Sequence, residues 1–68
     1  MENLKGFTFN YSKIVVVQNV NSISKSSDSS GNPEIKILYT SNEIEIVSYG
    51  MEKFRDYDFD SFQRAYVH

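Results

Sequence analysis

Two segments in the middle of the chain alternate apolar and polar residues with the period of a β-strand. They span residues 34–39 and 43–49. Each therefore has one face suited to burial. The polar residues 40–42 between them suit a turn, because asparagine tolerates the left-handed backbone region. This pattern predicts an antiparallel hairpin.

The N-terminal third also reads as strand. Residues 7–11 alternate aromatic and polar side chains, and residues 14–17 form a continuous β-branched and apolar run, a composition that favours strands. Val17, Val20 and Ile23 then follow three residues apart, which breaks the alternation and predicts a bulge or a bend.

Residues 24–33 are dominated by small polar side chains, with five serines and no apolar side chain other than Pro33. This composition predicts a flexible, solvated loop. A phosphate-contacting or partner-contacting loop is the alternative. The segment does not match a P-loop, because it has a single glycine and lacks the Gly-Lys-Ser/Thr ending.

The segment from residue 51 to residue 67 is rich in residues that favour helix. A continuous helix would place Asp58 in the middle of its apolar face, which is unfavourable for a carboxylate without a partner. We therefore predict a break near residues 56–58, with Asp58 or Asp60 as the N-cap of a second helix. The apolar face in question carries Met51, Phe54, Phe62 and Ala65.

These elements predict one α+β domain over residues 1–68. It is a small antiparallel β-meander of four to five strands with a C-terminal helical segment packed on one face. The expected core draws side chains from every element: Phe7, Phe9, Val15, Val17, Val20, Ile35, Ile37, Ile44, Ile46, Phe54, Phe62 and Ala65.

The second face of the predicted sheet is more apolar than contact with water requires. Such a face marks an interface in many proteins, so we expect a homodimer or a complex with another protein. The side chains assigned to this face are Val16, Leu38, Val47 and Tyr49.

Composition limits the chemistry available to the chain. It has 68 residues, no cysteine and a single histidine, His68 at the chain end. A disulfide and a thiolate metal site are excluded. A hydroxyl nucleophile would lack a base. We therefore expect a protein that is not an enzyme and needs no cofactor or metal. A long apolar N-terminal stretch is absent, so we expect a cytoplasmic location and no membrane span.

The formal net charge is −2, and the acidic residues are concentrated in the C-terminal part. Residues 41–68 carry six acidic and three basic side chains, whereas residues 1–40 carry three acidic and four basic ones. This balance argues against general nucleic-acid binding, which needs a basic face.

The stretch from Asp56 to Asp60 alternates aspartate with aromatic residues. Its spacing matches the start of a calcium-binding loop, but Ser61 stands where that loop needs glycine and Val67 where it needs glutamate. One interpretation is a helix cap with solvated acids. The other is an acidic–aromatic surface that binds a basic partner, formed by Glu52, Asp56, Tyr57, Asp58 and Asp60.

The sequence thus favours a small non-enzymatic interaction protein. In size and charge it resembles the small acidic inhibitors with which phages block host enzymes, a likeness of composition that transfers no residue. The alternative is a module that binds single-stranded nucleic acid or a small ligand through exposed rings of its sheet. The candidate rings are Phe7, Phe9, Tyr11, Tyr39 and Tyr49.

Overall fold

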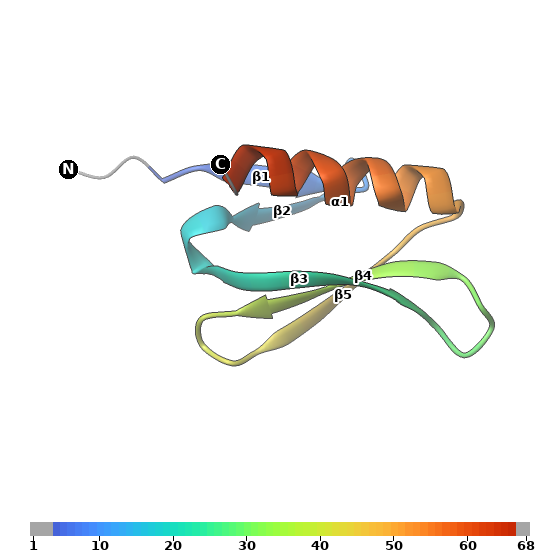
Figure 1. The fold of residues 1–68 in the computed structure, drawn as a ribbon. Coiled ribbons are helices and arrows are strands. Elements are labelled where there is room, and N and C mark those ends of the chain that lie inside the picture. Colours follow the sequence, from blue (N-terminus) through green and yellow to red (C-terminus); the bar gives the residue numbers. More distant parts are fainter. Residues whose placement is uncertain (1–3, 67–68) are drawn as a thin grey trace.

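The computed structural model describes residues 4–66. His68, which we expected to have no catalytic role, lies outside the described residues. The α+β class is confirmed: five antiparallel strands precede one C-terminal helix (Figure 1). In chain order the elements are β1 (Gly6–Phe9), β2 (Lys13–Val16), the 3-10 helix η1 (Val17–Asn19), β3 (Val20–Ser27), β4 (Pro33–Tyr39), β5 (Ile44–Ser48) and α1 (Glu52–Tyr66).

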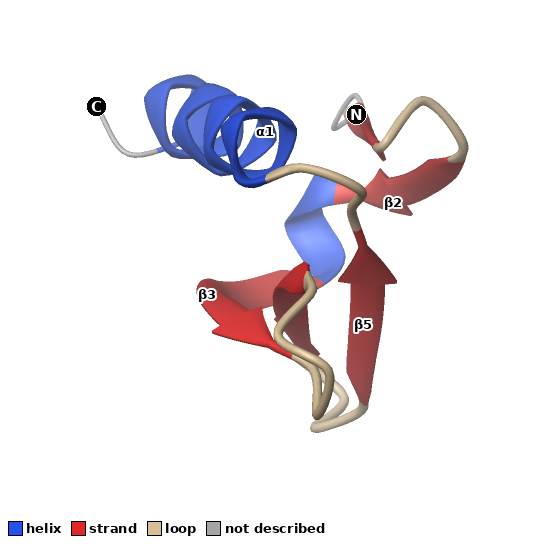
Figure 2. Cartoon of the chain, turned by 90° about the vertical axis from the view of Figure 1, so that its right-hand side faces the viewer, coloured by secondary structure: helices blue, strands red, loops and turns tan. Residues whose placement is uncertain are grey.

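The strands follow one another as predicted but belong to two sheets. β1 and β2 form a hairpin, while β3, β4 and β5 form a three-stranded sheet with β4 in the centre. The division falls at η1, and the pairing of β3 with β4 shifts between Val20 and Ser22. The predicted bulge or bend in this region is therefore confirmed. Viewed end-on, α1 and the β1–β2 hairpin lie together over the same face of the three-stranded sheet (Figure 2).

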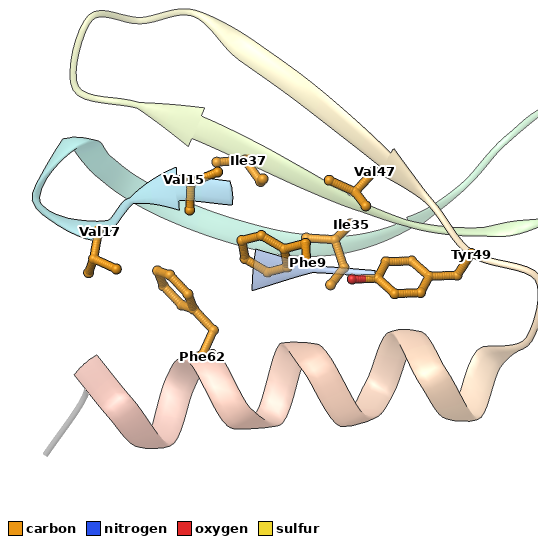
Figure 3. Packing of buried hydrophobic residues seen from close by; sticks show 8 residues of the cluster. All are labelled: Phe9, Val15, Val17, Ile35, Ile37, Val47, Tyr49 and Phe62. Carbon is orange, nitrogen blue, oxygen red and sulfur yellow. The ribbon is translucent and has the colours of Figure 1, made fainter. Parts of the chain in front are cut away.

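The core fills the space between this sheet face, the hairpin and α1. Figure 3 shows Phe62 of α1 pointing towards Phe9 and Val17, with Ile35 and Ile37 of β4 on the side away from the helix. Six residues of the predicted core are buried: Phe9, Val15, Val17, Ile35, Ile37 and Phe62. Phe7 and Val20 are partly buried against them.

β5 presents the opposite face from the one predicted. Ile44 and Ile46 are 61% and 43% exposed, whereas Val47 and Tyr49, assigned to the outer face, are buried. The register explains the difference, because Val47 pairs with the fully buried Ile35 and therefore shares its face. Over residues 44–49 each face carries two apolar side chains and one polar one, so alternation alone does not choose between them.

The predicted break in the helical segment is wrong, since α1 runs without interruption from Glu52 to Tyr66. Its buried face is rotated away from the predicted one and carries Arg55 and Phe62, with Phe59 partly buried, while Phe54 and Ala65 are exposed. Asp58 lies at the border of the buried face, where it accepts hydrogen bonds from Asn10 and Tyr49. Helical periodicity could not predict these two partners.

The serine-rich segment is shorter as a loop than the predicted residues 24–33. β3 continues through Ser27 and β4 begins at Pro33, which leaves residues 28–32 as the connection. Asp28 organises this turn, because its Oδ1 accepts hydrogen bonds from the backbone N–H groups of Ser30 at 2.8 Å and Asn32 at 2.9 Å. The backbone hydrogen bond from Asn32 is the main reason that the pKa of Asp28 lies below its usual value.

Candidate acidic–aromatic surface

The helix separates the five residues predicted to form one partner-binding surface. Successive residues of an α-helix point in directions about 100° apart, so neighbours in sequence reach different surroundings. Tyr57 is 67% exposed, and the side chains of Glu52 and Asp60 are 77% and 67% exposed. Asp56 and Asp58 are half-buried and have partners on other elements.

Asp58 fastens the helix to the two segments beneath it. Its Oδ2 accepts a hydrogen bond from the backbone N–H of Asn10 at 2.8 Å and another from the hydroxyl of Tyr49 at 2.7 Å. Asn10 also donates its side-chain amide to the carbonyl of Ser48 at 2.8 Å. Asp58 therefore acts as a structural acceptor at the meeting point of the β1–β2 turn, the end of β5 and α1.

Arg55 was not singled out by the sequence, yet it is buried and joins α1 to β3. Its Nη1 donates to the carbonyl of Ser26 at 3.0 Å, while its Nε and Nη2 reach Asp56 at 3.0 Å and Glu52 at 3.2 Å. These bonds satisfy a guanidinium group that burial would otherwise destabilise.

Asp56 completes this connection. Its Oδ1 also lies 3.2 Å from the ammonium group of Lys25 on β3. Desolvation raises the pKa of Asp56, but the hydrogen bonds from Arg55 and Lys25 outweigh it and hold the pKa below its ordinary value. Asp56 is therefore held in an internal ion-pair network rather than presented freely to a partner.

Three exposed rings gather beside the first half of α1, and the sequence did not predict their meeting. Tyr11, Phe54 and Tyr57, together with Lys53, line a shallow hollow of about 300 Å³. Tyr11 is 93% exposed and Phe54 47% exposed. Phe54 was expected in the core, so its place here is a correction that follows from the rotated helix face.

Tyr11 is held in an unfavourable backbone conformation. It occupies a turn closed by a hydrogen bond from the Ser12 N–H to the Phe9 carbonyl at 3.2 Å, with φ values of 50° at Asn10 and 61° at Tyr11. Left-handed φ at both central positions is the pattern of a type I′ turn, in which glycine is strongly preferred second. A bulky tyrosine at this position is unusual, because its side chain disfavours a left-handed backbone.

Replacing Tyr11 with glycine should stabilise the domain. The left-handed conformation costs an L-residue about 1–2 kcal/mol and costs glycine little, although the greater freedom of glycine in the unfolded chain offsets part of the gain. We expect a net increase of about 0.5–1 kcal/mol in the free energy of unfolding, measured by urea denaturation. Tyr11→Ala, which keeps the strain, is the matched control and should give no increase.

The rings proposed for base stacking have other positions. Phe9 and Tyr49 are buried, while Phe7 and Tyr39 are partly buried. Of the candidates on the predicted sheet, Tyr11 alone is largely exposed, and it lies in a turn.

The predicted second sheet face is rearranged in the same way. Val47 and Tyr49 belong to the core, and Val16 is partly buried on β2 of the other sheet. Leu38 does lie on the outer face of the three-stranded sheet, where it pairs with Ile44. The exposed apolar side chains of that face are therefore Ile44 and Ile46, beside a partly buried Leu38.

A larger hollow of about 570 Å³ lies between the second half of α1 and β3. Val17, Ile23 and Phe62 contribute its apolar lining, and Gln63 is among its polar residues. None of the five predicted partner-binding residues lines it.

Tyr39, Glu45 and Lys13 form a hydrogen-bonded chain beneath the hairpin. The Tyr39 hydroxyl donates to Oε1 of Glu45 at 2.6 Å, and Lys13 pairs with the other carboxylate oxygen. Burial, followed by the hydrogen bond to Glu45, raises the pKa of Tyr39 to about 12. Hydrogen bonds from Lys13 and Tyr39 lower the pKa of Glu45.

The fold should therefore lose stability in alkali. Because the pKa of Tyr39 rises from 10.0 to about 12 on folding, its contribution is complete below pH 10 and is lost as the pH approaches 12. Burial raises the pKa of Tyr49 in the same direction. Urea midpoints should fall over this range, and Tyr39→Phe should make the decline less steep. An unchanged slope in this variant would contradict the assignment.

Within residues 4–66, no group of three or more histidine, cysteine, aspartate or glutamate residues is arranged to hold a metal ion. Over the same residues, no helix has both the length and the apolar character needed to cross a membrane. Comparison with protein-family models, curated proteins and solved structures found no match. The exposed side chains of this chain are therefore the only guide to its function.

Proposed function

We propose that the chain is a small non-enzymatic interaction protein that binds a basic surface of a larger protein through the exposed side of α1. The observation that carries the proposal is the group formed by Tyr11, Phe54 and Tyr57, whose rings line one hollow in water. Aromatic rings are enriched at the centres of protein interfaces, where their burial supplies much of the binding energy.

The carboxylates of the same helix supply the complementary charge. Glu52 and Asp60 are the exposed ones, and each has an arginine of its own helix as partner, with Asp60 lying 3.0 Å from Arg64. The Asp60–Arg64 pair is exposed at both ends, and such pairs contribute little to stability, so Asp60 can exchange its partner at little cost. Glu52 is itself exposed but also bonds to the buried Arg55. Asp56 and Asp58 instead hold α1 in place through their bonds to Lys25 and Asn10.

The biological form that we propose is inhibition in the cytoplasm, as carried out by small acidic proteins of phages or mobile elements. A basic groove on a host enzyme would be occluded by the acidic side of α1. Attraction between opposite charges would accelerate the encounter, and the three rings would hold the complex.

Charge reversal tests the proposal. The tagged chain and a Glu52→Lys/Asp60→Lys variant are compared for the proteins that they retain from lysate, which are identified by mass spectrometry. We expect a basic protein that is retained by the unaltered chain, released by salt and lost with the variant. Glu34→Lys/Glu43→Lys is the matched control, because it makes the same change in net charge on the sheet. Equal retention by the unaltered chain and the α1 variant would refute the proposal.

The Tyr11 variants add a second test of the same surface. Tyr11→Gly and Tyr11→Ala both remove a ring from the hollow, so both should release the retained protein. Only Tyr11→Gly is expected to raise stability, which separates lost binding from lost folding. Retention of the partner by both variants would remove Tyr11 from the proposed surface.

A homodimer is the second proposal, and a different observation favours it. Ile44 and Ile46 are exposed on the outer face of the three-stranded sheet, beside the partly buried Leu38. Figure 2 shows α1 and the β1–β2 hairpin both on the opposite side of this sheet. Exposed apolar groups of this kind often mark a contact with another chain.

A further inference from the structure

The open edge of the three-stranded sheet belongs to β5. The strand order is β3-β4-β5, so among the described residues β5 has a strand neighbour on one side only, and its ribbon lies at the margin of the sheet (Figure 2). β3, the other end strand, has an irregular register, and Arg55 donates a hydrogen bond to its Ser26 carbonyl. β5 pairs with β4 in a regular register.

The backbone groups that point out from this edge can be identified. The N–H of Tyr49 bonds to the Pro33 carbonyl and the Glu43 carbonyl accepts from the Tyr39 N–H, both at 2.9 Å, so odd-numbered residues of this segment face β4. Because antiparallel strands alternate, the even-numbered residues face outwards. These are Ile44, Ile46 and Ser48.

The common protections of an edge strand are missing from β5. Its five residues, Ile-Glu-Ile-Val-Ser, include no proline and no lysine, and its register with β4 has no bulge. Glu45 is charged, but its carboxylate is engaged by Lys13 and Tyr39. The Ser48 carbonyl accepts a hydrogen bond from the side-chain amide of Asn10. The rest of the edge presents the outward N–H and C=O groups of Ile44 and Ile46, whose side chains are exposed.

We infer that a second copy of the chain pairs with this edge, so that β5 and its symmetry mate run antiparallel about a two-fold axis at Ile46. The inference rests on the proposed homodimer and specifies its contact. Ile46 pairs with Ile46 of the second copy, and Ile44 pairs with Ser48. Ile44, Ile46 and Ser48 thus exchange backbone hydrogen bonds with the second copy, and the Ser48 carbonyl, which has two lone pairs, keeps its bond from the Asn10 amide. The two sheets become one continuous sheet.

Charge disfavours the registers with the axis at Glu45 or at Ile44, and an axis at Val47 would pair Ile44 with Gly50, which lies beyond the end of β5. A two-fold axis at Glu45 would place the two Glu45 residues opposite each other, and an axis at Ile44 would place Glu43 opposite Glu45. Like charges directly across antiparallel strands are destabilising. With the axis at Ile46, Glu45 lies opposite Val47 and Glu43 lies opposite Tyr49, so no like charges meet. The exposed isoleucines of both copies then form one apolar stripe.

The absence of cysteine makes a clean cross-linking experiment available. Residues of a hydrogen-bonded antiparallel pair have Cα atoms about 5.5 Å apart, within the range of a disulfide. Ile46→Cys in the full chain should therefore form a disulfide-linked dimer readily on mild oxidation. The control is Ile14→Cys, because Ile14 is even more exposed at 71% but lies on β2. It should cross-link only by random collision.

Light scattering over micromolar to millimolar concentrations supplies the second measurement. The unaltered chain should approach twice its monomer mass of 7.9 kDa. Ile46→Lys should weaken the dimer roughly tenfold or more, because two like charges would face each other. Ile14→Lys should leave it unchanged.

The outcomes distinguish pairing through the β5 edge from dimer formation by any other contact. A dimer in which Ile46→Cys cross-links no faster than Ile14→Cys would overturn edge pairing and leave the homodimer standing. A monomer at every concentration would overturn both. Circular dichroism of each variant confirms that the substituted chain is folded, as expected for a side chain that is 43% exposed.

Discussion

Replacing Phe9 with alanine should remove much or all of the stability of the domain. Phe9 is fully buried, and the centroid of its ring lies 4.7 Å from the ring centroid of Phe7 and 5.6 Å from that of Phe62. Removing a buried phenylalanine typically costs about 3–5 kcal/mol. A domain of this length has a total stability of only roughly 3–10 kcal/mol, so the loss consumes much or all of it. Thermal and urea denaturation followed by circular dichroism would measure the effect.

Phe54→Ala is the matched control, because it removes the same side chain from a site that is 47% exposed. We expect it to lower the free energy of unfolding by no more than about 1 kcal/mol, since burial energy scales with the area removed from water. Comparable losses in the two variants would contradict the assignment of Phe9 to the core and of Phe54 to the surface.

The second large effect is expected at Asp58. Asp58→Ala removes the acceptor for the Asn10 N–H and the Tyr49 hydroxyl. Hydrogen bonds to charged groups contribute about 1.5–3 kcal/mol, and a buried donor left without an acceptor carries a penalty of similar size. We expect a loss of about 2–4 kcal/mol in the free energy of unfolding. Asp60→Ala, which breaks only an exposed pair, should change it by less than about 0.5 kcal/mol.

A double-mutant cycle would identify the cause. If the Tyr49 hydroxyl depends on Asp58, then Asp58→Ala should cost less in a Tyr49→Phe background than in the unaltered chain, by about 1 kcal/mol or more. Additive losses would mean that Asp58 stabilises the fold by another route and that its contact with Tyr49 contributes little.

Local pattern was sufficient for much of the fold. The hairpin of β4 and β5, with Asn42 in the left-handed region at a φ of 74°, follows directly from alternation and turn chemistry. Ile35 and Ile37 were assigned correctly because they are the apolar face of the central strand, whose burial does not depend on distant details.

The predicted break in the helix was wrong because the partners of Asp58 lie far from it in sequence. Helical periodicity detects that Asp58 lies near the apolar face, but it contains no information about acceptors and donors elsewhere in the chain. The partner at Asn10 is 48 residues away in sequence. A carboxylate that looks incompatible with a continuous helix is thus compatible with one once the β1–β2 turn is brought beneath it.

The ring cluster was missed because its members come from separate elements. Tyr11 lies in the β1–β2 turn, whereas Phe54 and Tyr57 lie on α1, and only the docking of hairpin on helix brings them together. The available signal was an aromatic residue directly after asparagine, between two segments that read as strand, a position where a hairpin turn favours glycine.

The bond between Asn10 and Asp58 also bears on how the chain is made. A ribosome adds Asp58, the acceptor for Asn10, 48 residues after Asn10 itself, when the β1–β2 hairpin has already been synthesised. Until then the N-terminal hairpin has neither Asp58 to fix its turn nor Phe62 to cover Phe9. A two-stranded hairpin is at best marginally stable by itself. The chain should therefore reach its folded state only after translation of α1, and chains halted before that point should be targets for proteases and chaperones.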